Sequence, residues 1–77
     1  MNWMYLSFAS DAGFLDGCVV RAKSIDQAVR EAHRLGINPG GDVLGLEVPA
    51  HMIPQPHYRE RLMTKDEIRS MEREMLS

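Results

Sequence analysis

The chain has 77 residues, of which 44% are hydrophobic and 26% are charged, and its formal net charge is −2. This length allows one small domain, and the composition is typical of a globular fold, which argues against a disordered chain. The absence of a basic excess disfavours generic binding of duplex nucleic acid, and a single cysteine excludes an intramolecular disulfide. No apolar run reaches the length of a membrane span, and the N-terminal residues do not resemble a secretory signal. We therefore expect a soluble protein of the cytoplasm.

Residues 3–9 and 14–22 are predicted to form two strands. Both segments are rich in aromatic, apolar or β-branched side chains, and residues 10–13 between them are typical of a turn. A turn this short predicts an antiparallel hairpin. Strand alternation places Met4, Leu6 and Phe8 on one face of the first strand. It likewise places Cys18, Val20 and Ala22 on one face of the second strand. Trp3 and Tyr5 lie on the other face of the first strand, so both of its faces carry large side chains.

A helix is predicted from Ser24 to Leu35. Ser24 and Gln27 have the spacing of a capping box, in which each side chain accepts a hydrogen bond from the backbone near the other residue. The apolar positions recur with helical spacing: Ile25, Ala28, Val29, Ala32 and Leu35. Gly36 follows where a left-handed residue ends many helices. The small apolar side chains predict close packing against a sheet.

A third strand is predicted at residues 42–48, after a turn at residues 38–41, which read NPGG. Proline at the second position and glycine at the third favour a type II turn with a positive φ at Gly40. The order strand, strand, helix, strand predicts a small α/β (α+β) domain, with one helix packed on a three-stranded sheet. The third strand is expected to lie parallel to the second or beside the first.

Residues 49–58 hold three prolines and are predicted to lack regular structure, as part of an extended arm. Thr64 begins a second helix, because Thr64 and Glu67 form another capping box. Met63 and Ile68 can pack across this cap as a hydrophobic staple. The apolar stripe of the helix is narrow: Ile68, Met71, Met75 and Leu76. The predicted organisation is a compact domain, an arm and a terminal amphipathic helix, over residues 1–48, 49–63 and 64–77.

The segments YLSFA, GFL, CVV and LGINPGG follow one another along the chain, with the alanine-spaced helix before the last of them. Further positions extend this pattern: Pro54, Tyr58, Arg59, Arg61, Leu62 and Thr64. In these features most of the chain resembles a family of short proteins encoded by bacteriophages, by prophages and by some bacterial genomes. It differs at one position, because Asp16 precedes Gly17 where a glycine is expected after FL. The resemblance implies a phage-type accessory protein and carries over no catalytic residue.

Asn38, Gly40 and Gly41 form the first candidate ligand site. Consecutive glycine amides can approach and hold an anion. This loop leaves the C-terminus of a helix, however, where the helix dipole repels anions, and Asp42 adds a negative charge. The loop therefore has two interpretations, a ligand-binding loop and a structural turn from helix to strand.

Tyr58, Arg59 and Arg61 form the second candidate ligand site. Arginine donates paired hydrogen bonds to phosphate or carboxylate groups, and tyrosine offers a ring for stacking. The alternative is structural: the arm packs Tyr58 into the core while its arginines pair with acidic residues of the terminal helix. Trp3 and Tyr5 have the same two interpretations, as platforms for a base or as core aromatics.

Neither a catalytic nor a metal-binding pattern is present in the sequence. His33, His51 and His57 lack the spacing and the cysteine partners of a metal site. Cys18 lies in an apolar strand without a neighbouring base, which predicts a small core residue and not a nucleophile. We therefore expect no enzymatic activity, no metal and no cofactor.

A homo-oligomer, most simply a two-fold dimer, is predicted from the size of the chain. The core of so short a chain is marginal, and a single helix cannot cover both faces of the sheet. The arm would then cross to a partner, bury Met71, Met75 and Leu76 there and form a shared pocket with Arg59 and Arg61.

Three functions remain open after the sequence analysis. The favoured one is an oligomeric phage protein that sequesters a nucleotide-derived immune signal of the host without catalysis, because the phage resemblance, the glycine loop and the arginine cluster all fit it. The alternative is an interaction protein that inhibits a host protein by contact, through the arm and the methionine stripe. A small hydrolase is the third hypothesis, for which no motif has the required spacing.

Overall fold

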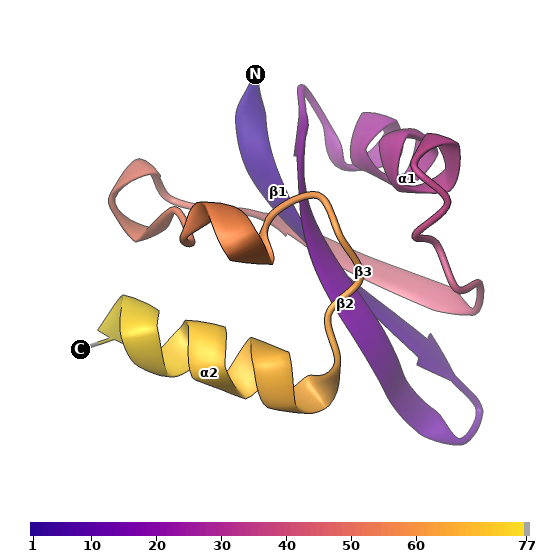
Figure 1. The fold of residues 1–77 in the computed structure, drawn as a ribbon. Coiled ribbons are helices and arrows are strands. Elements are labelled where there is room, and N and C mark those ends of the chain that lie inside the picture. Colours follow the sequence, from indigo (N-terminus) through magenta and orange to yellow (C-terminus); the bar gives the residue numbers. More distant parts are fainter. Residues whose placement is uncertain (77) are drawn as a thin grey trace.

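The computed structural model describes residues 1–76, except for the side chains of Leu15 and Leu76. Three strands and two α-helices follow one another: β1 (Asn2–Ser10), β2 (Gly13–Ala22), α1 (Ile25–Arg34), β3 (Asp42–Glu47) and α2 (Lys65–Leu76). Two single-turn 3₁₀ helices lie between β3 and α2: η1 (Ala50–Met52) and η2 (Pro56–Tyr58). The predicted α+β class and the order of the strands and α-helices are confirmed (Figure 1). None of the described helices is long and apolar enough to cross a membrane.

The three strands form one antiparallel sheet with β1 in the centre, in the order β2-β1-β3. β1 pairs with β2 as the predicted hairpin and with β3 on its other side, where Tyr5 lies opposite Leu46. The third strand therefore lies beside the first and runs in the same direction as the second, as expected. The hairpin register shifts by one residue between Phe8 and Ala9. Asp16, where the sequence departs from the phage pattern, pairs with Phe8 at this bulge.

α1 covers one face of the sheet (Figure 1). The core beneath it is formed by eight buried side chains: Met4, Leu6, Phe8, Cys18, Val20, Ala22, Ala28 and Ala32. The two helical alanines let α1 approach the strands closely, as predicted. Gly45 of β3 serves the same close approach, because a Cβ atom there would lie 2.8 Å from side-chain atoms of Ile25.

Both ends of α1 are capped by the residues that the sequence predicts. At the start, the Gln27 amide donates to the Ser24 hydroxyl oxygen at 3.1 Å. The Gln27 side chain reaches back one residue further than expected and accepts from the Lys23 amide at 2.5 Å. At the end, Gly36 has a φ of +73°, and the Ile37 amide donates to the Ala32 carbonyl at 3.0 Å. These bonds satisfy helix-end groups that would otherwise have no partner.

α2 lies against the second face, so the sheet is enclosed between two helices (Figure 1). The core on this side has six buried side chains: Val19, Val48, Tyr58, Met63, Ile68 and Met71. Trp3 and Tyr5, the large residues of this face, are half-buried beside them. The expectation that this face needs a partner chain is wrong, because the chain's own terminal helix covers it. Met71, which the sequence analysis assigned to a partner, is only 4% exposed within its own chain.

The start of α2 explains why this helix folds back on its own sheet. The Glu67 amide donates to the Thr64 hydroxyl at 3.3 Å, and the Thr64 amide donates to the Glu67 carboxylate at 3.2 Å. Met63 and Ile68 are both buried in the second core on either side of this cap. The predicted capping box and staple are thus confirmed, and together they fix the angle at which the helix leaves the sheet. The side chain of Leu76, the last residue of the predicted stripe, lies outside the described ones.

Residues 49–63 do not form the extended arm that the sequence analysis expected. η1 and η2 lie within this segment, and its last residues run along the outer edge of β2. The Glu60 amide donates to the Val19 carbonyl at 2.8 Å, and Gly17 and Met63 exchange backbone hydrogen bonds of 3.2 and 2.7 Å. The prolines allow this path, because the fixed φ of proline suits the first turn of a helix. The segment is therefore part of the domain, and it covers an edge of the sheet.

Candidate ligand site around Trp3

The predicted loop site at residues 38–41 is a tightly built turn. The Gly40 amide donates to the Asn38 side-chain oxygen at 2.8 Å. Gly40 has a φ of +88°, which confirms the positive φ expected for the type II turn. Gly41 has a φ of +81°, and a Cβ atom on it would lie 2.3 Å from the Ala9 carbonyl oxygen. The structural interpretation thus accounts for both glycines, and a ligand role of this loop stays a prediction.

Tyr58 and Arg61 are engaged within the chain. Tyr58 is buried, and its hydroxyl forms a hydrogen bond with Glu74. Burial, followed by this contact with Glu74, raises the pKa of Tyr58 above its usual value. Arg61 donates from Nε to the His57 carbonyl at 2.6 Å and forms an ion pair with Glu67 at the start of α2. Both residues thus make the contacts of the structural interpretation, in which Tyr58 packs into the core and Arg61 pairs with an acidic residue of the terminal helix.

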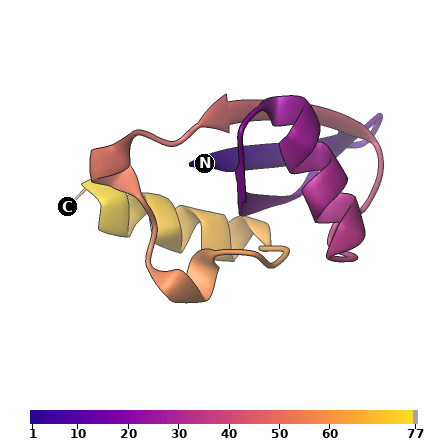
Figure 2. The same cartoon turned by 90° about the horizontal axis from the view of Figure 1, so that it is seen from above.

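The structure does not bring the two predicted groups of site residues together. The turn at residues 38–41 and the helices η1 and η2 lie at opposite ends of the molecule in Figure 2. A ligand that touches both groups in one subunit is therefore not supported by this arrangement.

Arg59 differs from Arg61, because its guanidinium group lies over an aromatic ring. The Cζ atom of Arg59 is 4.9 Å from the centre of the Trp3 ring, and its Nε donates to the Pro54 carbonyl at 3.0 Å. Arg21 lies opposite Trp3 in the hairpin, with its Cζ atom 5.7 Å from the same ring. Within residues 1–76, neither Arg21 nor Arg59 forms an ion pair with a carboxylate. Trp3 is therefore a half-buried ring beside two guanidinium groups that form no ion pair within the described residues.

A surface hollow of about 360 Å³ adjoins the Trp3 ring. Its walls come from one end of the sheet, where β1 begins and β2 and β3 end, and from the start of the 49–63 segment. They include Asn2, Trp3, Arg21, Glu47, Pro49 and Ile53. Asn2 donates a hydrogen bond from Nδ2 to the Glu47 carboxylate, so these two side chains are already oriented. The hollow thus combines an aromatic face, a cationic group, an amide–carboxylate pair and an apolar wall. Its volume lies at the lower end of the range of small-molecule sites.

Sequence reasoning named Trp3 and Arg59 but missed Arg21. The signal for Arg21 is its position opposite Trp3, and this pairing is set by the hairpin register, which depends on the bulge near Asp16. A one-residue error in register would turn the side chain to the other face of the sheet. Once the bulge is placed between Phe8 and Ala9, the register of the hairpin puts Arg21 opposite Trp3.

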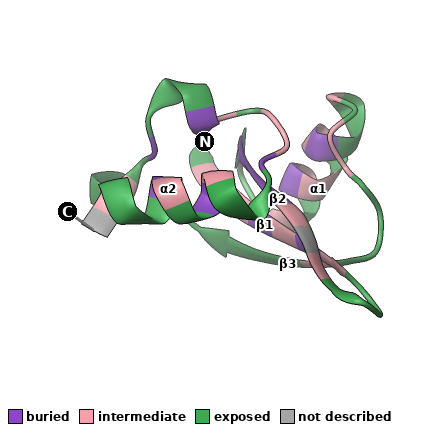
Figure 3. Cartoon of the chain, turned by 60° about the horizontal axis from the view of Figure 1, so that its bottom comes forward, coloured by how far each residue is buried: buried purple, intermediate pink, exposed green. Residues whose placement is uncertain are grey.

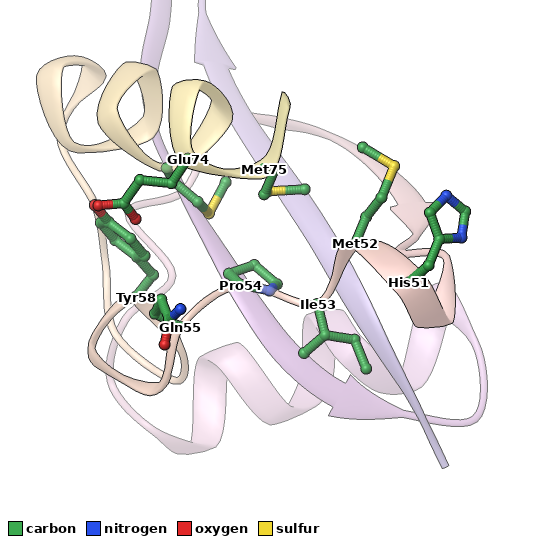
Figure 4. A pocket seen from close by; sticks show the side chains of 9 residues that line it. His51, Met52, Ile53, Pro54, Gln55, Tyr58, Glu74 and Met75 are labelled. Atoms are coloured by element: carbon green, nitrogen blue, oxygen red, sulfur yellow. The ribbon is translucent and has the colours of Figure 1, made fainter. Parts of the chain in front are cut away.

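A second, methionine-lined cleft lies between η1 and α2. Met52, Met71 and Met75 line two adjoining hollows there, of about 270 and 190 Å³. The smaller hollow has apolar walls that reach Leu46 and Val48 of the sheet face. Figure 4 shows the larger one, with the Met52 and Met75 side chains on facing walls and the Glu74 carboxylate beside the end of the Tyr58 ring. This cleft suits an apolar contact and not an anion, because its charged rim is acidic.

The remaining candidate groups have structural surroundings. Cys18 is fully buried, and burial raises the pKa of its thiol to about 12, so the thiolate is not populated near neutral pH. The three histidines, His33, His51 and His57, are exposed. Among the described residues no group of three or more histidine, cysteine or acidic side chains converges as a metal site would require.

Comparison with protein-family models, with curated proteins and with solved structures finds no match for this chain. The resemblance to short phage proteins therefore stays a prediction from sequence motifs.

Proposed function

We propose that the protein binds a small aromatic anion of the nucleotide class, without converting it, in the hollow beside Trp3. The observation that carries this proposal is the Trp3 ring flanked by Arg21 and Arg59, neither of which pairs with a carboxylate within the described chain. A base would stack on the ring, as aromatic side chains commonly allow, and a phosphate would accept hydrogen bonds from a guanidinium group. Asn2 and Glu47 would offer a donor and an acceptor to the edge of the base.

The biological setting of this proposal comes from the sequence resemblance. A phage-encoded protein with such a site would act in the cytoplasm of an infected bacterial cell, where it would sequester a nucleotide-derived immune signal as a homo-oligomer. Binding without turnover is in line with the buried Cys18 and with the structural contacts of the other candidate side chains. The ligand would lie away from the glycine turn, against the Trp3 ring over which the Arg59 guanidinium group lies, although Arg59 does not itself line the hollow.

Titration of the protein with a panel of cyclic nucleotides, cyclic dinucleotides and ADP-ribose derivatives tests this function. Trp3 is the only tryptophan of the chain, so stacking of a base should quench its fluorescence, and calorimetry supplies the affinity. The Arg21→Gln variant should bind about tenfold more weakly or worse, since it loses a charged hydrogen-bond donor. Arg21→Lys should recover part of the affinity. Arg30→Gln is the matched control, because Arg30 is an exposed residue of α1 that does not line the hollow.

Two outcomes would count against this function. If no member of the panel quenches Trp3 fluorescence or releases heat, nucleotide binding is wrong. If a nucleotide binds but is recovered as a changed product after denaturation of the protein, the hydrolase hypothesis replaces sequestration.

The methionine-lined cleft favours a second candidate function, inhibition of a host protein by direct contact. Methionine side chains adapt to partners of different shape, and clefts between a helix and a neighbouring segment accept apolar anchors. In this case Met75→Lys should abolish capture of a purified host partner, and Arg21→Gln should leave it unchanged. The opposite pattern, loss with Arg21→Gln alone, would contradict contact through the cleft.

A further inference from the structure

The two outer edges of the sheet differ in whether another segment of the described chain covers them. Residues 60–63 run along the outer edge of β2 and bond to the backbone of Gly17 and Val19. No segment of the described chain lies along the outer edge of β3. Figure 3 shows β3 as a largely exposed strand. An open edge of this kind is a template for another strand, and β3 carries neither the proline nor the lysine that often blocks such an edge.

The exposed leucines of β3 lie next to this open edge. Leu44 is 78% exposed and Leu46 is 55% exposed, although both belong to an otherwise ordered sheet. Both point to the face that α2 covers elsewhere, and Leu46 forms part of the wall of the methionine-lined cleft. Solvation of two adjacent leucines on an open strand is unfavourable, so a partner that covers them would stabilise the molecule.

The backbone groups that face the open edge follow from the pairing of β3 with β1. The Val48 amide donates to the Trp3 carbonyl at 2.8 Å, so Val48 belongs to the residues whose backbone faces β1. Hydrogen-bonded and non-bonded positions alternate along an antiparallel pair. The backbone groups of Val43, Gly45 and Glu47 therefore point outward, where they are free to bond to another strand.

We propose that the occupant of this edge is β3 of a second copy of the chain, paired antiparallel about a two-fold axis at Gly45. In this register Val43 hydrogen-bonds with Glu47 of the partner subunit, and Gly45 with Gly45 of the partner subunit. Leu44 then lies opposite Leu46 of the partner subunit in a non-bonded pair, where side chains approach most closely. The two three-stranded sheets become one sheet of six strands, and four leucines form one apolar cluster on its face.

Two antiparallel copies of β3 fit each other in this register but not in the registers shifted by two residues. Neither Asp42 nor Glu47 faces another acidic residue, because each would lie opposite a valine of the partner subunit. A shift by two residues in one direction places Leu46 opposite the partner's Asp42. A shift in the other direction demands a backbone donor from Pro49, which has none. This self-complementarity favours a second copy over an unrelated strand.

This interface specifies the contact between subunits in the homo-oligomer of the proposed function, and it rests on the existence of that oligomer. It replaces the exchange of a C-terminal arm, since Met71 is already buried within its own chain. Ligand affinity is not a readout of the test below, so failure of the interface leaves the Trp3 site standing, and failure of ligand binding leaves the interface standing.

The test combines the mass of the protein in solution with disulfide trapping. Light scattering at micromolar concentration should give the mass of a dimer. Leu44→Lys should give a monomer that keeps the far-ultraviolet circular dichroism of the folded chain and unfolds at a lower temperature than the dimer, since it loses the stabilisation by association. Leu44→Cys and Leu46→Cys, mixed and mildly oxidised, should form a covalent dimer, since directly opposed residues lie within disulfide range. Either variant alone should not, and Cys18 is too deeply buried to interfere. Ile53→Cys, which is exposed but outside β3, mixed with Leu46→Cys is the control.

Three results would overturn the proposal in distinguishable ways. A monomeric wild-type mass would remove both the oligomer and this interface, and would leave the edge to a strand of a different protein. A dimer without trapping in the mixture would retain the oligomer but refute the β3 edge as its interface. Efficient trapping of Leu44→Cys alone would refute the register centred on Gly45.

Discussion

Gly40 and Gly41 are adjacent residues with positive φ angles, yet the structure requires glycine at each for a different reason. At Gly40 a Cβ atom would meet no heavy atom within 4 Å, so the only cost of a side chain is backbone strain. At Gly41 the same atom would lie 2.3 Å from the Ala9 carbonyl oxygen, which is backbone and has little freedom to move. The first glycine thus serves the turn, and the second serves the contact between this turn and β1.

Alanine substitutions at these two residues should separate strain from collision. We expect Gly40→Ala to lower the free energy of unfolding by about 1 kcal/mol, the cost of a left-handed alanine. Gly41→Ala should cost more, roughly 2–4 kcal/mol, because strain and the clash with Ala9 add. Urea unfolding of the two variants beside the wild type measures the difference. Equal losses would contradict the close approach to Ala9.

Cys18 gives a pH-dependent prediction at the scale of one residue. Burial raises the pKa of the Cys18 thiol from its ordinary value of 9.0 to about 12. Above pH 9 the unfolded chain loses this proton and the folded chain does not, so the free energy of unfolding falls as the pH rises. Below pH 9 the thiol is protonated in both the folded and the unfolded chain, so this loss of stability has not yet begun. Cys18→Ala should lack this part of the decline, and parallel unfolding curves of both proteins between pH 8 and pH 10 measure it.

At the scale of elements, Glu67 at the start of α2 takes part both in the helix cap with Thr64 and in an ion pair with Arg61. Hydrogen bonding to Arg61, followed by hydrogen bonding at Thr64, lowers the pKa of Glu67 below its usual value. A lowered carboxyl pKa stabilises the fold above the unfolded value, and this stabilisation is lost as the pH falls through the folded value. Arg61 therefore anchors the chain to α2 in addition to its bond to the His57 carbonyl.

Glu67→Gln isolates the charge of this residue, because glutamine keeps the shape of a capping box. We expect the variant to be less stable than the wild type near pH 7, and this difference to disappear as the pH falls through the lowered pKa of Glu67 and the carboxyl becomes protonated. Thermal unfolding followed by circular dichroism at pH 7 and in an acid series supplies the comparison. Thr64→Ala, which removes the cap at neutral and at acid pH, should cost about 1 kcal/mol under both conditions. A difference between wild type and Glu67→Gln that persists at low pH would refute the ion pair as its cause.

The elements that could be predicted from sequence are those whose signals are local. The caps at Ser24 and Thr64 and the glycine after α1 depend on residues within one helical turn of each other, and their predicted positions are confirmed. The path of residues 49–63 could not be predicted, because its bonds to β2 join residues more than 40 positions apart. The Trp3–Arg21 pair was missed for a similar reason, since it depends on a bulge in the hairpin.

At the scale of the whole molecule, β1 is shared by both cores. Its alternate residues face opposite sides: Met4, Leu6 and Phe8 lie under α1, while Trp3 and Tyr5 lie under the second layer. Neither layer can separate from the sheet without exposing one face of this central strand. The two cores are therefore expected to fold and unfold as one cooperative unit, as small single domains usually do.

A charge placed in either core should unfold the whole molecule, including the layer that is not substituted. Ala32→Asp puts an uncompensated carboxylate between α1 and the sheet, and Met71→Asp does the same on the other face. Trp3 reports on the second layer only, so its fluorescence distinguishes local from global unfolding. We expect the Ala32→Asp protein to show both the tryptophan emission and the far-ultraviolet circular dichroism of an unfolded chain, although Trp3 lies on the opposite face from Ala32. Native Trp3 emission in that variant would show instead that the second layer holds together without α1. In that case, the hollow beside Trp3 would be open to study in a chain without the first core.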